Sequence, residues 1–363
     1  MKSIPVGIMT VNEDYFLMNY GSFLQHYALR LVLTRLGYAP FRVLYRSYLR
    51  TLARYALTPF LGKGHDRMRR FIRRERFASE YRKLIGPVFE LPKKNPSAYV
   101  VGSDCVWMTH EPCAFLIGKE YVGRKIAYAV STAWDLFEDD SVWRSRLQEV
   151  DETFAAVAVR EEYGRRTVAP LLPHQKVDCV LDPTMLLTHT DYEAIVSGKP
   201  YFAKPTLLYY VVNVWTYAAL QLDLLEATAK SLNCELKIIG IQGAEDFTPK
   251  RYRLDPNPCD FIRAIRDAAY VVTNSFHGIA FSIVFRKQFV FLTQLAKRYG
   301  NQNCRQDEVL TKMNLLNRRI DSATVSPESL KNAIEVPLDV KSLDGCCEAE
   351  RSRCLKWLKD ALS

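Results

Sequence analysis

The sequence predicts an α/β protein made of two Rossmann-like domains that face a cleft. Short apolar runs rich in Val, Ile and Tyr recur along the whole chain, as in the buried strands of parallel sheets. Patterns of helical period separate these runs, which indicates repeated β–α units. The chain has 363 residues, more than one ordinary core accommodates, so two domains are expected.

The expected strands form two groups, one in each half of the chain. The first group comprises Ile4–Met9, Phe41–Tyr45, Ala98–Gly102, Ile126–Val130, Ala156–Arg160 and Val177–Leu181. The second group comprises Leu207–Asn213, Leu236–Gly240, Tyr270–Thr273 and Phe289–Leu292. The expected helices between them include Tyr20–Leu36, Tyr217–Leu232, Phe261–Asp267 and Gly278–Phe285.

The domain boundary is expected between Thr190 and Pro205, where Ser-Gly-Lys-Pro and Lys-Pro interrupt regular structure. The first domain is therefore assigned to residues 1–200. The second domain, which ends in a helix, is assigned to residues 201–363. The uncharged stretch from Pro205 to Leu222 contains Asn, Thr and Gln, which favours a buried strand followed by a helix over a membrane span.

The composition indicates a globular protein of the cytoplasm. Hydrophobic residues make up 48% of the chain and charged residues 25%, the usual balance for a folded domain. The nine cysteines are odd in number and lack metal-ligand spacing, which is typical of reduced thiols. The apolar run that opens the chain is too short for a signal peptide.

The net charge of +10 comes from one segment. Between Arg42 and Lys83 there are thirteen Lys and Arg against three Asp and Glu, an excess equal to the net charge of the whole chain. Arginines recur every fourth residue from Arg42 to Arg54, so in a helix they would share one face. This pattern indicates either basic amphipathic helices on an anionic membrane or a Rossmann helix with a solvated basic face. No nucleic-acid motif accompanies the charge, so no nucleic-acid partner is expected.

The sharpest local feature is the segment Tyr270-Val-Val-Thr-Asn-Ser-Phe-His-Gly, in which a buried strand is followed by a helix within a few residues. Ser275 can cap that helix, and Gly278 permits a ligand to approach the backbone closely. The free N–H groups and the helix dipole would then bind a phosphate or carboxylate beside His277. The same residues are equally compatible with a capping serine and a partly buried histidine that bonds a backbone carbonyl.

Five segments, in order, resemble the polysaccharide pyruvyltransferase family. Thr-Asn-Ser-Phe-His-Gly at residues 273–278 is similar to the family's Thr-Asp-Ser-Phe-His-Gly, and Asn-Tyr-Gly-Ser-Phe-Leu-Gln-His at residues 19–26 is similar to its first helix. Gly-Ser-Asp-Cys-Val-Trp at residues 102–107 resembles Gly-Ser-Asp-Gln-Val-Trp. Arg-Glu at residues 160–161 and Asp-Pro-Thr at residues 182–184 match two further family elements.

The resemblance implies an architecture like that of GT-B glycosyltransferases and an enzyme that uses phosphoenolpyruvate. Such an enzyme transfers pyruvyl to two hydroxyls of a sugar as a cyclic ketal. His277 would be the general acid that protonates the enol carbon, since an imidazole has an ordinary pKa of about 6.5. Ser275, Phe276 and Gly278 would bind the donor in the second domain. The chemistry requires no metal and no other cofactor.

Polar residues of the first domain are the expected contacts of the acceptor sugar. They are Asn19, Gln25, Ser103 and Asp104. For each of them a structural role, as a helix cap or a contact with a neighbouring loop, is the competing interpretation. Trp107 and Tyr20 could form a stacking wall for a sugar, although large aromatic residues at such positions usually belong to the core.

Two departures from the family pattern shift the expected donor contacts. Several members carry an arginine two positions before the histidine, where this chain has Ser275. Arg160 is then the first candidate to bind the anionic donor, and Arg305 the second. The competing interpretation of Arg160 is an ion pair with a following glutamate. Asn274 replaces the usual Asp and so removes a general base or an orienting group for the histidine.

The acceptor is expected to be a precursor of a capsular polysaccharide or exopolysaccharide, carried on undecaprenyl lipid. The enzyme would then lie peripherally on the inner leaflet of the plasma membrane, held by the basic segment Arg42–Lys83. Two alternatives stay open. A nucleotide-sugar-dependent glycosyltransferase would share the fold, because fold does not fix the reaction. A non-catalytic, membrane-docked subunit of an assembly complex would explain the changes at Ser275 and Asn274.

Overall fold

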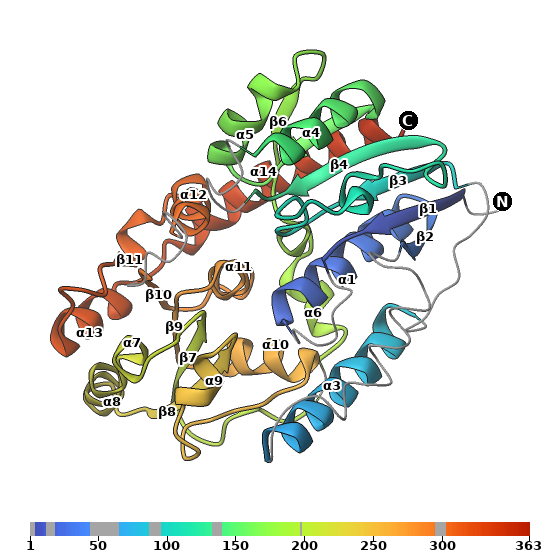
Figure 1. Ribbon diagram of the computed structural model, residues 1–363. Helices are drawn as coiled ribbons and strands as arrows, with labels where there is room; N and C mark the ends of the chain where they lie inside the picture. Colours follow the sequence, from blue (N-terminus) through green and yellow to red (C-terminus); the bar gives the residue numbers. More distant parts are fainter. Residues whose placement is uncertain are drawn as a thin grey trace. The chain divides into compact units, whose positions relative to one another are not determined.

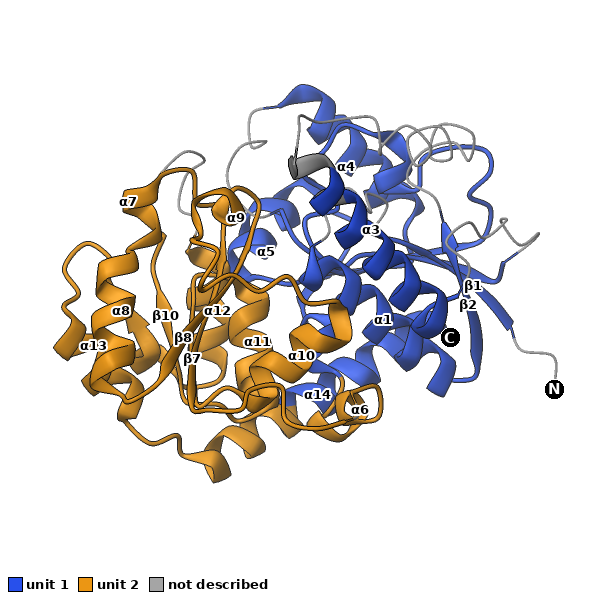
Figure 2. Ribbon diagram, turned by 90° about the horizontal axis from the view of Figure 1, so that it is seen from below, with its two compact units in different colours: residues 1–186, 350–363 blue, residues 187–349 orange. Residues whose placement is uncertain are grey.

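The computed structural model describes residues 4–11, 19–43, 65–86, 96–132, 140–196, 198–294 and 303–363. Contacts within the chain divide it into two compact units, which are coloured separately in Figure 2. Unit 1 comprises residues 1–186 and 350–363, and unit 2 comprises residues 187–349. Each unit contains one parallel sheet with helices packed on it, so the predicted α/β class with two Rossmann-like domains is confirmed.

Unit 1 is built on a six-stranded parallel sheet (Figure 1). Its strands are β1 (Ile4–Met9), β2 (Tyr38–Val43), β3 (Ala98–Val101), β4 (Arg124–Val130), β5 (Ala156–Val159) and β6 (Val177–Cys179). Their order in space is β2-β1-β3-β4-β5-β6. β2 lies on one side of β1 and all later strands lie on the other, so the strand order reverses between β1 and β3. Open α/β sheets bind ligands at such a switch point, beyond the carboxyl ends of the strands.

Helices and short 3₁₀ turns connect these strands. They are α1 (Tyr20–Arg35), α3 (His65–Leu84), η2 (Pro112–Phe115), α4 (Ser141–Thr153), α5 (Glu162–Val168), η4 (Ala169–Leu171) and η5 (Pro183–Met185). The two aromatic residues considered for sugar stacking are core residues. Trp107 is fully buried and stacks on Phe115, with ring centroids 5.6 Å apart. Tyr20 is also fully buried and packs against Phe77.

The C-terminal helix α14 (Val340–Leu362) belongs to both units, because the division falls between Ala349 and Glu350. Within unit 1 the indole N–H of Trp357 donates to the Asp178 carboxylate at 2.9 Å. The Arg353 guanidinium donates to the Cys179 carbonyl at 2.9 Å. The last part of the chain therefore packs on a sheet whose strands all come from the first half.

Unit 2 is built on a five-stranded parallel sheet in the order β11-β10-β9-β7-β8. The strands are β7 (Thr206–Val212), β8 (Glu235–Ile241), β9 (Tyr270–Thr273), β10 (Phe289–Leu292) and β11 (Arg319–Ile320). In both sheets the second strand of the unit lies on one side of the first strand, and the later strands follow in order on the other side. Its switch point therefore lies between β7 and β9.

The other elements of unit 2 are helices and one 3₁₀ turn. They are α6 (His189–Glu193), α7 (Tyr217–Leu220), α8 (Leu222–Ser231), α9 (Ala244–Phe247), α10 (Pro258–Asp267), α11 (Phe276–Val284), α12 (Cys304–Lys312), η6 (Leu316–Arg318) and α13 (Pro327–Glu335). The predicted helix Tyr217–Leu232 is two helices, because Gln221 adopts a left-handed φ of 54° between them. No helix among the described residues is long and apolar enough to cross a membrane.

The observed division falls at Leu186, before the boundary expected between Thr190 and Pro205. The reason is the packing of α6, whose Tyr192 ring lies 5.1 Å from that of Phe281 in unit 2. The assignment of residues 201–363 to one domain also differs from the structure, because the end of α14 packs in unit 1.

The basic segment begins in a strand, as the predicted strand Phe41–Tyr45 implies, and not in the helix that the arginine spacing would allow. Arg42 lies in β2, paired in register with Ile8 of β1, and its buried guanidinium lies over the Tyr81 ring at 5.4 Å. The strand pairing explains the difference, because it fixes an extended backbone at Arg42. Arg46, Arg50 and Arg54 lie outside the described residues. In α3, Arg73 and Arg74 are buried as well, so part of the positive charge serves packing rather than the surface.

His26, on α1, is fully buried and its ring packs near that of Tyr81. Neither of its ring nitrogens has a hydrogen-bond partner among the described residues. Burial lowers the pKa of His26 well below its usual value, and the charges of Arg42 and Arg30 lower it further. The folded protein therefore holds His26 neutral, whereas the unfolded chain binds a proton below about pH 6.5.

Replacing His26 with Leu is expected to stabilise the protein and to weaken its acid sensitivity. Removing an unsatisfied buried polar group should raise the free energy of unfolding by about 1–2 kcal/mol at pH 7.5. Below about pH 6.5 the wild type should lose up to about 1.4 kcal/mol more per pH unit than the variant, because only its unfolded state takes up this proton. Urea denaturation of both proteins from pH 7.5 to 5.5 measures the difference. Parallel pH profiles would contradict this assignment.

Candidate functional site

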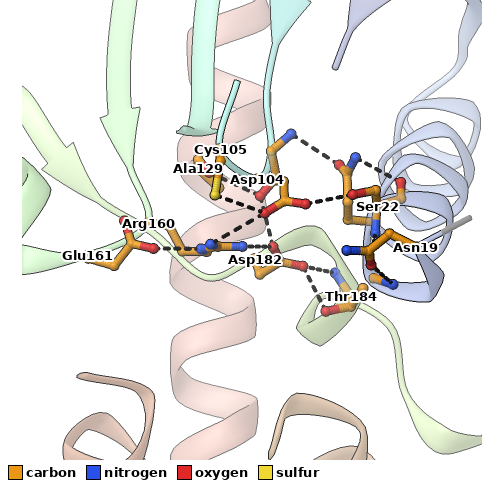
Figure 3. Close-up of polar contacts among 12 residues, drawn as sticks. Asn19, Ser22, Asp104, Cys105, Ala129, Arg160, Glu161, Asp182 and Thr184 are labelled. Atoms are coloured by element: carbon orange, nitrogen blue, oxygen red, sulfur yellow. Dashed lines mark hydrogen bonds and ion pairs between the residues drawn. The ribbon is translucent and has the colours of Figure 1, made fainter. Parts of the chain in front are cut away.

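Polar side chains gather at the carboxyl edge of each sheet, and the group in unit 1 surrounds Arg160 (Figure 3). The Arg160 guanidinium donates to Glu161 and to Asp182, each at 2.8 Å, and lies 3.7 Å from Asp104. All four side chains are buried. Burial lowers the pKa of Arg160, but the carboxylates of Glu161, Asp182 and Asp104 together raise it above its usual value. Arg160 is therefore the fixed positive centre of a buried acidic cluster.

Two of the predicted acceptor residues, Ser103 and Asp104, belong to this cluster. The Ser103 hydroxyl donates to Asp182 at 2.8 Å. Asp104 accepts from the hydroxyl of Ser22 on α1 at 2.7 Å, as Figure 3 shows. Asp104 has a left-handed φ of 68°, so the chain turns sharply directly after β3. These bonds join the end of β3 to α1 and to η5.

The other two predicted acceptor residues, Asn19 and Gln25, lie on α1 and border the cluster. The Asn19 side chain caps α1 by accepting from the N–H of Gly21 at 2.8 Å. Gln25 is fully buried, donates to the Thr10 hydroxyl at 2.6 Å and accepts from the N–H of Ser103 at 3.1 Å. Thr10 follows β1 and Ser103 follows β3, so Gln25 lies at the switch point of the sheet.

The structure thus brings together residues that the sequence suggested one by one. Their polar groups bond mainly to one another, which corresponds to the competing structural interpretations, including the ion pair of Arg160 with Glu161. Three carboxylates lie within 4 Å of the Arg160 guanidinium, and two of them accept hydrogen bonds from it. Asp182, which the sequence analysis named only as part of the Asp-Pro-Thr element, is central, because it bonds Arg160, Ser103 and Thr184.

In unit 2 the predicted donor residues lie where β9 is followed by α11. Ser275 occupies the N-cap position, but its side chain makes no capping bond. The predicted capping bond is therefore wrong. The backbone N–H of Ser275 donates to the Thr273 hydroxyl at 3.0 Å. The first bond of the helix runs from Ile279 N to the Ser275 carbonyl at 3.1 Å. His277 lies in the first turn of α11, is 6% exposed, and packs its ring against Phe276.

Gly278 is required for packing within the protein. A Cβ at this position would lie 2.1 Å from the Thr273 hydroxyl oxygen. The absent side chain thus lets α11 approach β9 closely, whereas the sequence interpretation assigned that space to a ligand.

Asn274 ties β9 to β7. Its amide oxygen accepts from the N–H of Val212 at 2.9 Å, and its amide nitrogen donates to the Val212 carbonyl at 2.8 Å. A carboxylate could only accept, so the Asn that departs from the family pattern satisfies both backbone groups. The Asn274 carbonyl in turn accepts from Gln306 on α12 at 3.0 Å. Arg305, the second predicted donor contact, is the neighbour of Gln306 in the first turn of α12.

A pocket of about 480 Å³, its open mouth included, lies at the carboxyl edge of the unit 2 sheet. Its walls come from the segments that follow β7, β9, β10 and β11, among them Asn213, Trp215, Asn274, Gln294 and Ser322. The pocket therefore lies at the switch point between β7 and β9. Sequence reasoning missed it. The available signal was the same as for the histidine segment, a buried strand followed at once by polar and aromatic residues.

Comparison with known proteins identifies a matching family and similar solved structures. A family model described as polysaccharide pyruvyl transferase matches residues 19–294. UDP-N-acetylglucosamine 2-epimerase from Rickettsia bellii is similar in structure, with 9% sequence identity, a TM-score of 0.51, and coverage of 99% of this chain and 97% of that chain. No sequence among the curated proteins matches this chain.

Two further solved structures match with lower TM-scores. MurG from Acinetobacter baumannii has 12% identity and a TM-score of 0.45, with 99% of each chain covered. The heptosyltransferase WaaC from E. coli has 11% identity and a TM-score of 0.41, with 91% of this chain and 98% of that chain covered. The expected fold class is confirmed by the two parallel sheets, together with the structural similarity to the Rickettsia bellii epimerase over nearly the whole of both chains.

Proposed function

The chain belongs to the polysaccharide pyruvyl transferase family, and on that premise we propose that it transfers pyruvyl from phosphoenolpyruvate to two hydroxyls of one sugar, forming a cyclic ketal. The observation that carries this proposal is the family match, because the matched residues 19–294 include the whole Thr-Asn-Ser-Phe-His-Gly segment. The acceptor is proposed to be a surface-polysaccharide precursor on undecaprenyl lipid.

The reaction needs one proton donor and one anion-binding site. His277 gives a proton to C3 of phosphoenolpyruvate, which makes C2 electrophilic, and a sugar hydroxyl attacks C2 and loses its own proton. The C–O bond to phosphate then breaks, and inorganic phosphate leaves with the bonding electrons. A second hydroxyl of the same sugar attacks C2, loses its proton and closes the ketal. The products are the ketal and phosphate, so no oxidant or reductant is consumed.

Features of the first turn of α11 support this assignment. The N–H groups of Phe276, His277 and Gly278 precede the first bond of the helix, and such groups bind phosphate or carboxylate well. Within the described part of the chain, the Ser275 hydroxyl makes no hydrogen bond, so it can serve as a donor contact. Arg305 is proposed as a further contact.

The test is acceptor-dependent release of phosphate from phosphoenolpyruvate by the purified protein. Undecaprenyl-linked oligosaccharides ending in galactose or mannose serve as acceptors. Phosphate release together with a product heavier by one ketal-linked pyruvate would establish the reaction. Turnover of a nucleotide sugar on the same acceptors, without use of phosphoenolpyruvate, would refute it.

Membrane binding through α3 is proposed as the way the enzyme reaches a lipid-linked acceptor. Met68 is 64% exposed and Ile72 is 43% exposed, and their spacing of four places them on one face of α3. Arg76, four residues further, is exposed on the same face, and Lys83 is exposed near the end of the helix. Exposed apolar residues next to cations are typical of helices that lie in an anionic bilayer surface.

Replacing Met68 and Ile72 together with Ser is expected to weaken binding to phosphatidylglycerol-containing vesicles at least about tenfold. Half-burial of two such side chains in the bilayer is worth more than about 1.4 kcal/mol. Co-sedimentation with vesicles measures the change. Val142 on α4, which is 45% exposed in the same unit, provides the matched control when replaced with Ser. Equal binding of the double variant and the control variant would exclude α3 as the contact.

A further inference from the structure

The residues that line the pocket at the switch point of unit 2 are not the types expected to bind phosphoenolpyruvate. Phosphoenolpyruvate carries a phosphate and a carboxylate, and proteins bind such groups with Arg, Lys or several N–H donors. Among the described residues that line this pocket, none is charged. Hydroxyl and amide side chains alternate there with aromatic and aliphatic surface. Such a lining favours a neutral ligand that is rich in hydroxyls.

Trp215 provides an apolar platform at the pocket. Its side chain is 52% exposed, which is unusual for so large an apolar residue. One side of the indole is fixed by Gly243, because a Cβ at Gly243 would lie 2.7 Å from the ring. Gly243 has a φ of 99°, a conformation suited to glycine. The indole is thus held in place by backbone while much of its surface stays open, as a stacking platform requires.

Polar groups border this platform. Asn213 follows β7 with a left-handed φ of 57°, and within the described residues its side-chain amide makes no hydrogen bond. Gln294 follows β10, and its side-chain amide nitrogen donates to the Asn274 carbonyl across a long distance of 3.3 Å. Both amides offer a donor and an acceptor, the combination that sugar hydroxyls match. A pyranose has an apolar C–H face and a polar rim, so the indole and the amides complement its two surfaces.

We propose that this pocket binds a neutral pyranose ring, stacked on Trp215 and hydrogen-bonded by Asn213 and Gln294. That ring is part of the acceptor oligosaccharide, and this identification alone rests on the proposed function. The inference assigns a saccharide subsite to unit 2. It also places this subsite at the end of β9, the strand that leads into the His277 segment.

The test is ligand-observed NMR of the full chain with the methyl glycosides of galactose, mannose and N-acetylglucosamine. At least one glycoside should show saturation transfer to its C–H protons. Replacing Trp215 with Ala should weaken that binding at least tenfold. Replacing Tyr217 with Ala is the matched control, because Tyr217 is 57% exposed nearby but does not line the pocket. Asn213→Gly removes the amide, keeps the left-handed backbone accessible, and should weaken binding as well.

The outcomes separate this inference from the proposed function. Saccharide binding that depends on Trp215 supports the subsite even if phosphoenolpyruvate is never consumed. If transfer does occur, Trp215→Ala should raise the KM for acceptor at least tenfold and leave the KM for phosphoenolpyruvate unchanged. Absence of saturation transfer from all three glycosides would overturn the inference. Equal binding by the Trp215 and Tyr217 variants would overturn it too, as would displacement of the glycoside by phosphoenolpyruvate.

Discussion

Replacing His277 with Asn is expected to lower kcat for ketal formation by about 10²–10⁴-fold, the range ascribed to a positioned general acid. The carboxamide keeps much of the size of the ring but cannot deliver a proton to carbon at neutral pH. His277 is 6% exposed in the first turn of α11, so the exchange should preserve the packing of the helix on β9. Initial rates of phosphate release with saturating acceptor measure the loss.

The kinetic pattern identifies the role of His277. A fall in kcat with an unchanged KM for phosphoenolpyruvate indicates proton transfer, whereas a raised KM indicates donor binding. His189→Asn is the matched control, because this second histidine of unit 2 lies on α6 and contacts Arg286. Wild-type turnover by the His277 variant would remove the residue from the mechanism. Unchanged vesicle binding by the same variant would show that the loss is confined to chemistry.

Replacing Arg160 with Met is expected to lower the free energy of unfolding at pH 7 by about 3–5 kcal/mol. The change leaves Glu161, Asp182 and Asp104 buried together without the cation they share. Denaturant unfolding of the wild type and of the variant at pH 7 measures the loss.

A control for Arg160 lies on the following helix. Arg165 pairs with Glu162 at 2.6 Å, but its side chain is 42% exposed, so Arg165→Met should cost only about 0.2–1 kcal/mol. The same variants test the prediction that Arg160 binds the donor. A donor contact would raise the KM for phosphoenolpyruvate in Arg160→Lys, a variant that keeps the charge. A stable Arg160→Met protein with a raised KM would contradict the structural role.

The sequence predicted the elements well because their signals are local. The strands Ile4–Met9, Tyr270–Thr273 and Phe289–Leu292 were predicted with the bounds that the structure shows. β11 was missed because it has two residues, too few for any periodic pattern. The helix break at Gln221 was missed because its left-handed backbone is set by packing around α7 and α8, not by a glycine.

The partners of the polar residues could not be predicted in the same way. Ser103 and Asp182 are far apart in the sequence, and only the sheet order brings their side chains to 2.8 Å. The Arg-Glu pair at residues 160–161 was recognisable as a motif, but its burial beside Asp104 depends on strand neighbours. Asn274 looked like a lost carboxylate, whereas the structure shows an amide matched to both backbone groups of Val212. A single sequence names candidate residues, and the fold decides what each one contacts.

The path of α14 affects the order in which unit 1 can fold during translation. All six strands of unit 1 are translated before any strand of unit 2, yet the helix that contributes Trp357 and Arg353 to unit 1 is translated after every strand of unit 2. Until then the Asp178 carboxylate lacks the donor from Trp357, and the Cys179 carbonyl lacks the donor from Arg353. Unit 1 therefore begins before unit 2 and is completed only after the strands of unit 2, and a fragment that ended at Leu186 would lack these two contacts.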